Sequence, residues 1–302
     1  MSAQYAFEGS AAADNAVLPA GALGGTPAAA VVLEADWPVL SGAVFAAHLS
    51  TIEARLPDAA RARLAAFKNL SRRQQSLKAR LGALLLARQC LTGPCRYEEA
   101  PPFGPVIQAG GKSFFLTLAH TDGAFAAALS ETPAGIDVER VRPVKRLADM
   151  TAFAYGEAAG EAMRRRLKNA SPFELDAAID DFFSLWTLKE CEIKMNRTVG
   201  ALVHRPRVRA VFSSENETPQ LRFETEGLEA PVRAIRMACG QNRVFRAALL
   251  CESAQPPALG RLTPETLGID PQDLGAQLAA ILAALAAFSG RQAPESATDA
   301  EK

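Results

Sequence analysis

The apolar residues of the chain follow a helical spacing in some segments and an extended spacing in others. In Leu56–Leu91, leucines recur three and four positions apart, as at Leu77 and Leu81. This period places them on one face of a helix. We expect two helices here, meeting near Asn69–Ser71, with Ser71 as the N-cap of the second.

Two short apolar runs predict a β-hairpin. Phe114–Ala119 and Phe125–Leu129 flank Thr121–Gly123, and an Asp-Gly pair between such runs is a strong hairpin signal. A further strand is predicted at Gly135–Val141, and it ends before Pro143.

The rest of the pattern predicts one early strand, three more helical segments and a second group of strands. The early strand is Ala29–Leu33, and the helical segments are Ala148–Leu167, Asp176–Met195 and Pro271–Phe288. The second group of strands comprises Val208–Phe212, Gln220–Glu224, Val232–Met237 and Val244–Cys251.

This order of elements predicts an α+β fold with two similar α/β halves, residues 31–134 and 135–255. Residues 1–30 are rich in Ala, Gly and Pro without a clear period, and we expect them to be mobile. Residues 256–302 are predicted to form an accessory helix and a disordered tail. The segment after Pro257 is therefore expected to be dispensable for chemistry.

Composition narrows the class of protein. Lys+Arg and Asp+Glu are both 33, so the net charge is zero, which argues against a general nucleic-acid binder. The five cysteines are scattered and form no CxxC pair, which argues against a disulfide framework and favours a reducing compartment. No secretory signal is recognisable, and the apolar run Leu278–Phe288 is too short to span a bilayer. We expect a cytoplasmic protein without membrane contact.

Asp137 and Glu139 form the first candidate site. On a strand they alternate with Ile136 and Val138, so the two carboxylates share the face opposite the apolar pair. Mg²⁺ prefers oxygen ligands and is commonly held by one or two carboxylates plus substrate phosphates. The alternative is a solvated strand face with two ordinary acids, because D-x-E alone is very common.

Glu190 and Lys194 form the second candidate site. At helical spacing they fall beside Phe183, Trp186 and Ile193 rather than opposite them. Charges on an aromatic flank line a cleft or are half-buried, where they need partners. The alternative is an ordinary i,i+4 ion pair on the surface.

His120 is the third candidate, because it ends a predicted strand just before the hairpin turn. A single histidine is more often a hydrogen-bonded structural residue than a ligand contact. No Ser-His-Asp or Cys-His arrangement has supporting spacing, and no Gly-rich phosphate loop of the GxxxxGK type is present.

Taken in order, three stretches resemble a known family. They are FFLTLAHTDG (Phe114–Gly123), GIDVERVRP (Gly135–Pro143) and FFSLWTLKECEIK (Phe182–Lys194). Together they resemble the surfactin-type 4′-phosphopantetheinyl transferases, in which G-[IV]-D-x-E is followed further along by [FW]-[SCT]-x-K-E-[SA]-x-x-K. The resemblance runs from about Ala54 to Cys251.

The resemblance implies an Mg²⁺-dependent transferase with a fold of two similar α/β halves about a pseudo-twofold axis. It implies that Asp137, Glu139 and Glu190 are the Mg²⁺ ligands. Glu190 is also implied to take the proton of the acceptor serine, and Lys194 to contact and stabilise the coenzyme A phosphates.

The resemblance further assigns His120 and Arg80 to the adenosine 3′-phosphate of coenzyme A. Three positions depart from the family pattern. Cys191 stands where Ser or Ala is usual, and Ala119 replaces a Ser that normally donates to the nucleotide. The Phe103–Pro105 stretch lacks the lysine of the usual Gly-Lys-Pro.

The implied reaction moves the 4′-phosphopantetheine of coenzyme A to a serine of an apo carrier protein and releases 3′,5′-ADP. The carrier, an acyl or peptidyl carrier protein, is expected to dock near Ala148–Leu167, with Arg164–Arg166 as candidate contacts or, equally, as a solvated charged face. The chain is expected to be a monomer. Two alternatives stay open: another Mg²⁺-dependent phosphoanhydride hydrolase, and a catalytically degenerate carrier-binding module.

Overall fold

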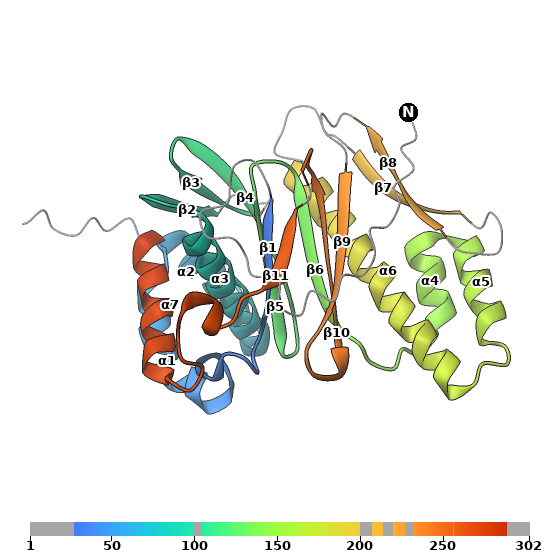
Figure 1. The fold of residues 1–302 in the computed structure, drawn as a ribbon, viewed down its shortest axis with the longest axis horizontal. Coiled ribbons are helices and arrows are strands. Elements are labelled where there is room, and N and C mark those ends of the chain that lie inside the picture. Colours follow the sequence, from blue (N-terminus) through green and yellow to red (C-terminus); the bar gives the residue numbers. More distant parts are fainter. Residues whose placement is uncertain are drawn as a thin grey trace, which may run out of the picture.

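Two β-sheets stacked face to face form the centre of the molecule, and helices cover the outer face of each sheet (Figure 1). The structure is a computed structural model that describes residues 27–99, 104–199, 207–213, 220–226, 232–255 and 257–288. The layers are therefore helices, sheet, sheet and helices. The mixed α+β class predicted from the order of elements is confirmed.

The first sheet has six strands in the order β11-β1-β5-β4-β3-β2. Neighbouring strands are antiparallel except β11, which runs parallel to β1. The predicted hairpin is β4–β5, and Gly123 takes a φ of 83° in its turn, a value that favours glycine. The strands are β1 (Ala28–Leu33), β2 (Cys95–Glu99), β3 (Pro105–Ala109), β4 (Lys112–Thr121), β5 (Ala124–Ser130) and β11 (Ala258–Arg261).

Four helices pack on the outer face of this sheet: α1 (Gly42–Arg55), α2 (Asp58–Ala65), α3 (Leu70–Cys90) and α7 (Leu274–Phe288). The predicted break before α3 is present, but the N-cap is Asn69 rather than Ser71. The Asn69 side chain accepts a hydrogen bond of 3.0 Å from the backbone N–H of Arg72, which satisfies a donor that the first helical turn leaves open.

The second sheet has three antiparallel strands in the order β6-β10-β9. They are β6 (Ala134–Arg140), β9 (Val232–Cys239) and β10 (Phe245–Glu252). The long helix α6 (Pro172–Val199) covers the outer face, and α4 (Leu147–Tyr155) and α5 (Glu157–Leu167) pack against it. A separate two-stranded sheet pairs β7 (Arg207–Ser213) with β8 (Gln220–Glu226).

The two large sheets meet through small and branched apolar side chains. Alanines of β5, including Ala126 and Ala128, face Ile136 and Val138 of β6 in one buried cluster. Small residues let the two backbones approach closely, since interiors pack without voids. The inward direction predicted for Ile136 and Val138 is thus confirmed. Asp137 lies on the opposite face of β6, toward α6.

The predicted internal symmetry is not shown by the described residues. The first sheet has six strands and the second has three. The boundary predicted near Ala134 coincides with the start of β6, where the chain passes from the first sheet to the second.

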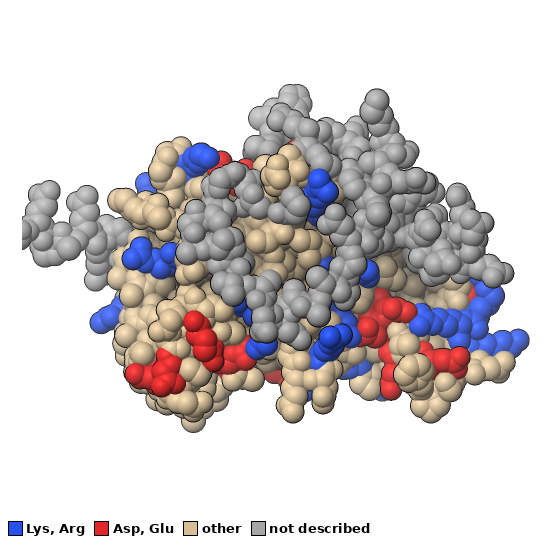
Figure 2. Space-filling view, in the orientation of Figure 1, with Lys and Arg blue, Asp and Glu red and all other residues tan. Residues whose placement is uncertain are grey.

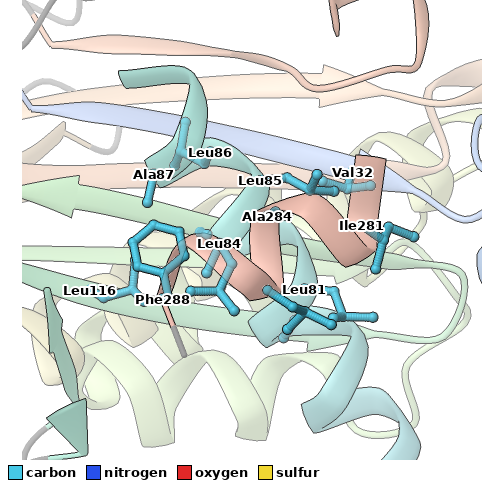
Figure 3. Packing of buried hydrophobic residues seen from close by; sticks show 14 of the residues in the cluster. Val32, Leu81, Leu84, Leu85, Leu86, Ala87, Leu116, Ile281, Ala284 and Phe288 are labelled. Atoms are coloured by element: carbon cyan, nitrogen blue, oxygen red, sulfur yellow. The ribbon is translucent and has the colours of Figure 1, made fainter. Parts of the chain in front are cut away.

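The segment after Pro257 is not an accessory element, and that expectation is revised. It adds β11 to the first sheet, and the indole N–H of Trp37 donates to the carbonyl of Leu262 at 2.9 Å. Figure 3 shows Ile281 and Phe288 of α7 in one packed cluster with leucines of α3. The segment completes the core of the N-terminal half. Residues 1–26 and 289–302, predicted to be a mobile segment and a disordered tail, lie outside the described residues.

Two further expectations concern membrane contact and cysteine pairing. Among the described helices, none is both long enough and apolar enough to cross a membrane. All five cysteines are free, and four of them are buried. Burial of this kind makes a thiol behave as a small apolar side chain.

Replacement of Leu285 by alanine is expected to destabilise the whole fold, because its side chain is fully buried between α7 and α3. Urea denaturation should show a loss of about 2–5 kcal/mol. Leu274→Ala at the exposed start of α7 is the control, with an expected change below about 0.5 kcal/mol. Equal effects of the two substitutions would show that α7 does not belong to the core.

Candidate functional site

The backbone of α6 lies directly against β6 at Gly135. A Cβ atom at Gly135 would lie 2.0 Å from the carbonyl oxygen of Cys191 and 2.8 Å from the backbone nitrogen of Met195. No side chain fits in that space, so the glycine that opens GIDVE is required by the contact between strand and helix. The contact brings the two motif segments side by side.

Cys191 occupies the helix side of this contact. It is fully buried, and its thiol donates to the carbonyl of Ala248 in β10 at 3.0 Å. Burial raises the pKa of the Cys191 thiol well above its usual value, so it is not a reactive nucleophile. The departure from Ser or Ala at this position keeps a small side chain with one hydrogen bond.

Lys194 and Asp137 form a direct ion pair between α6 and β6. The Lys194 ammonium donates to Asp137 Oδ1 at 2.6 Å and to the carbonyl of Ile136 at 3.0 Å. Asp137 is only 5% exposed. Burial raises the pKa of the Asp137 carboxyl, and the Lys194 ammonium opposes that rise. The sequence predicted both residues but not their pairing.

One oxygen of Asp137 remains open. Asp137 Oδ2 is buried and has no hydrogen-bond partner in the part of the chain that the structure describes. A buried acceptor without a partner carries a cost in free energy. The oxygen is therefore a natural point of attachment for a ligand that can donate or coordinate.

Glu139 lies further along the same strand and is paired with Arg142. The Arg142 guanidinium is 3.3 Å from Glu139 Oε2, and it stands over the ring of Phe183 in α6 at 5.3 Å from the ring centroid. Glu139 is close enough to Asp137 for its charge to contribute to the raised pKa of that carboxyl. Arg142 was not predicted, although it follows the motif directly.

Glu190 is half-buried on α6, and within the described ranges no hydrogen bond or ion pair engages its carboxylate. The i,i+4 pairing of Glu190 with Lys194, raised as an alternative, is not what is observed for Lys194, which reaches across to Asp137.

The predicted magnesium ligands Asp137, Glu139 and Glu190 have the right chemistry for a hard cation. They offer oxygen donors, and one of these is the open Asp137 Oδ2. However, the described residues contain no group of three or more His, Cys, Asp or Glu side chains placed to hold a metal ion. The chemistry of the donors fits, and the three-ligand arrangement is not preassembled.

His120 is exposed at the end of β4. Its pKa is lowered by the protein atoms around the ring and then by the positive charges of Lys194, Arg80 and Arg72. These cations come from α6 and α3, so three elements converge on the histidine. An anion placed there would meet several positive charges at once.

Arg80, predicted to contact a phosphate, is buried in an internal network. Its Nε and Nη2 donate to Glu99 Oε1 at 2.9 and 2.7 Å, and its Nη1 donates to Ser76 Oγ at 2.6 Å. The Tyr97 hydroxyl donates to the same Glu99 oxygen. Arg80 therefore contributes charge at long range while its guanidinium is held by Glu99.

Arg72 is the residue that the sequence reasoning missed on α3. It lies about two helical turns before Arg80, on the same side of the helix. In contrast to Arg80 it is exposed, so it is available to an anion near His120. Helical spacing from Arg80 was the signal that could have found it.

The departures from the family pattern have partial structural reasons. Ala119 is 3% exposed and packs between the two sheets, so a serine hydroxyl there would be buried away from His120. Gly104 lies where a Cβ would come within 2.8 Å of the carbonyl of Leu116. Phe103 lies outside the described residues.

The arginines considered for carrier docking are paired with acids of the same region. Arg164 contacts Glu161 at 2.8 Å and Glu157 at 3.3 Å, and Arg166 contacts Asp181 at 2.7 Å. Figure 2 shows Lys and Arg side chains intermixed with Asp and Glu at the end of the molecule where α4 and α5 lie. This pairing favours the interpretation of Arg164–Arg166 as a solvated charged face.

Comparison with known proteins adds no family assignment. No protein-family model matches the chain, and no curated protein matches it in a sequence comparison. The likeness to the transferases therefore stands on the motif residues and their arrangement.

Substitution of Gly135 by alanine should disturb both the fold and the site, because the new methyl group would overlap the α6 backbone. We expect a loss of about 1–3 kcal/mol in urea denaturation. Gly275→Ala in α7 is the control, because a Cβ there would meet only the Asp273 side chain, at 3.2 Å; it should change stability by about 1 kcal/mol or less. A Gly135→Ala protein as stable as Gly275→Ala would contradict the close contact.

The His120 side chain should titrate below its usual pKa of about 6.5, because partial desolvation by the protein atoms around the ring and nearby positive charges disfavour the imidazolium. NMR titration of the ring protons measures this directly. Arg72→Met should raise the pKa, and so should a bound anion. Anion affinity should accordingly increase as the pH falls through the pKa of His120. A pKa at or above 6.5 that Arg72→Met does not change would show that these positive charges do not act on His120.

Proposed function

We propose that the protein transfers the 4′-phosphopantetheine group of coenzyme A to a serine of a carrier protein and releases 3′,5′-ADP. The observation that carries this proposal is the Lys194–Asp137 ion pair. It joins the two motif segments, 57 residues apart in the chain. Each of these segments is a candidate site on its sequence pattern alone, and the ion pair gives them a common location.

The charges around the site suit a substrate that carries several phosphates. Arg72 and Lys194 place positive charge around His120, and Lys194 also bonds to the Asp137 carboxylate of β6. Positive side chains placed where charge develops on a leaving phosphate lower the barrier to transfer. Lys194 lies between the two regions and is the residue best placed to stabilise the departing phosphate.

Transfer requires a base for the serine hydroxyl. The serine oxygen attacks the β-phosphorus of coenzyme A, the bond from that phosphorus to the bridging oxygen breaks, and the bridging oxygen leaves on 3′,5′-ADP. Glu190 is a half-buried carboxylate without an ion-pair partner in the described ranges, so its lone pairs are free to accept the hydroxyl proton. No covalent enzyme intermediate is needed.

The proposed reaction depends on Mg²⁺. Asp137, Glu139 and Glu190 would hold Mg²⁺, and when bound it would neutralise charge on the two phosphates. The open Asp137 Oδ2 is the observation in favour of this role. The finer fold, two related α/β halves with the site at their junction, belongs to the same proposal, as do a monomeric state and a cytoplasmic location.

A degenerate carrier-binding module is the second candidate, favoured by one observation: among the described residues the metal ligands are not preassembled.

A single experiment separates the candidates. The protein is incubated with coenzyme A, Mg²⁺ and a panel of apo carrier proteins, and the carriers are weighed by mass spectrometry. A mass gain of one phosphopantetheinyl group supports transfer. Hydrolysis of coenzyme A without labelling indicates the hydrolase, and binding of a carrier without either reaction indicates the module.

Glu190→Gln should separate catalysis from binding. The amide keeps the shape of the side chain but cannot accept the serine proton, so transfer should fall by roughly 10²–10⁴-fold. Coenzyme A should still bind, since Lys194 and His120 do not depend on Glu190. Glu265→Gln, at an exposed position outside the expected carrier-docking segment, is the control and should transfer normally. Normal transfer by Glu190→Gln would exclude its role as the base.

A further inference from the structure

Lys194 and Asp137 are bonded to each other at the centre of the candidate site. Lys194 therefore stands where a cation would bind Asp137, and Asp137 stands where a phosphate would bind Lys194. Asp137 is 5% exposed and offers one oxygen to Lys194 while the other has no described partner. The Lys194 side chain is 22% exposed and also donates to the carbonyl of Ile136. The Lys194 ammonium is thus the main counter-charge of the buried Asp137 carboxylate.

A ligand that separates this pair leaves a buried charge behind. Breaking a buried ion pair by removing one partner is strongly unfavourable, because the remaining charge stays desolvated. A cation that binds Asp137 by itself must compete with the Lys194 ammonium. A phosphate that draws Lys194 by itself leaves the Asp137 carboxylate without that ammonium. When both ligands bind, each group receives a new counter-charge.

We propose that Lys194 exchanges between Asp137 and a phosphate group of the bound ligand, so that a divalent cation and a phosphate-bearing ligand bind cooperatively. The identity of the two ligands rests on the proposed function above. The exchange itself rests on the hydrogen bonds of Lys194 to Asp137 and Ile136.

The surroundings of Lys194 favour such an exchange. Lys194 is bonded to Asp137, and its charge also lowers the pKa of His120, as do the charges of Arg80 and Arg72. A phosphate beside His120 therefore lies within electrostatic reach of Lys194. Coupling between two sites is reciprocal, so each ligand must strengthen the other by the same factor.

Calorimetry on the full chain tests the exchange. Mg²⁺ is titrated into the protein with and without coenzyme A, and coenzyme A is titrated with Mg²⁺ or with EDTA. We expect each ligand to raise the affinity for the other by the same factor, of at least about fivefold. A cation that only bridges carboxylates and phosphates would also produce coupling, so the variants decide.

Two variants test the exchange, one by removing the Lys194 ammonium and the other by removing the charge of Asp137. Lys194→Met removes the competitor from Asp137, so Mg²⁺ without coenzyme A should bind at least about fivefold more tightly than to the wild type. Asp137→Asn keeps the shape but releases Lys194, so coenzyme A in EDTA should bind more tightly than to the wild type by a similar factor. Lys189→Met is the control, because Lys189 is paired with Glu192 on the same helix; it should change neither affinity.

The outcomes distinguish this inference from the proposed function. Simple bridging by the cation predicts that Asp137→Asn leaves the affinity for coenzyme A in EDTA unchanged, and that result overturns the exchange even if carrier labelling succeeds. Absence of coenzyme A binding under every condition overturns both. If Lys194→Met does not fold, the Asp137→Asn measurement decides alone. If Lys189→Met raises the Mg²⁺ affinity as much as Lys194→Met does, the loss of one positive charge anywhere on the helix explains the change, and the exchange is overturned.

Discussion

The contact between the α6 backbone and β6 at Gly135 is the constraint on which the rest of the site depends. Because no side chain intervenes, the helix lies close enough for Lys194 to reach Asp137 and for Cys191 to reach Ala248. The opposite face of β6 is held by apolar packing against the first sheet. The packing of β6 in the core thus fixes the position of Asp137 relative to α6.

The buried charged side chains in and near the candidate site are paired, and Glu139 is paired with Arg142 at a more exposed position. Asp137 is held by Lys194, Glu139 by Arg142, and Arg80 by Glu99. Buried charges persist in proteins when they are paired and hydrogen-bonded. His120 and Arg72, two further residues of the candidate site, are exposed. The proposed function uses this difference in exposure to assign ligand binding and catalysis to different residues.

The elements best predicted from the sequence were those with a strong local signal. The β4–β5 hairpin with its Asp-Gly turn, the β6 strand and the α6 helix lie where alternation and helical spacing placed them. The short strands β2, β3 and β11 and the mostly exposed helix α1 were missed, because short or weakly periodic segments depend on their neighbours for stability. The helix predicted as one segment at Ala148–Leu167 divides at Gly156, which takes a φ of 90°.

The sequence by itself determined which residue types stand on which strand and helix, and thereby the candidate set of Asp137, Glu139, Glu190, Lys194 and His120. Only the tertiary structure decided their partners: Lys194 with Asp137, Arg80 with Glu99, and α7 with α3. The physical reason is the distance along the chain over which each kind of interaction acts. Periodicity and turn chemistry act over a few residues, whereas the partner of a buried charge or an apolar face depends on which distant segments the whole core brings together.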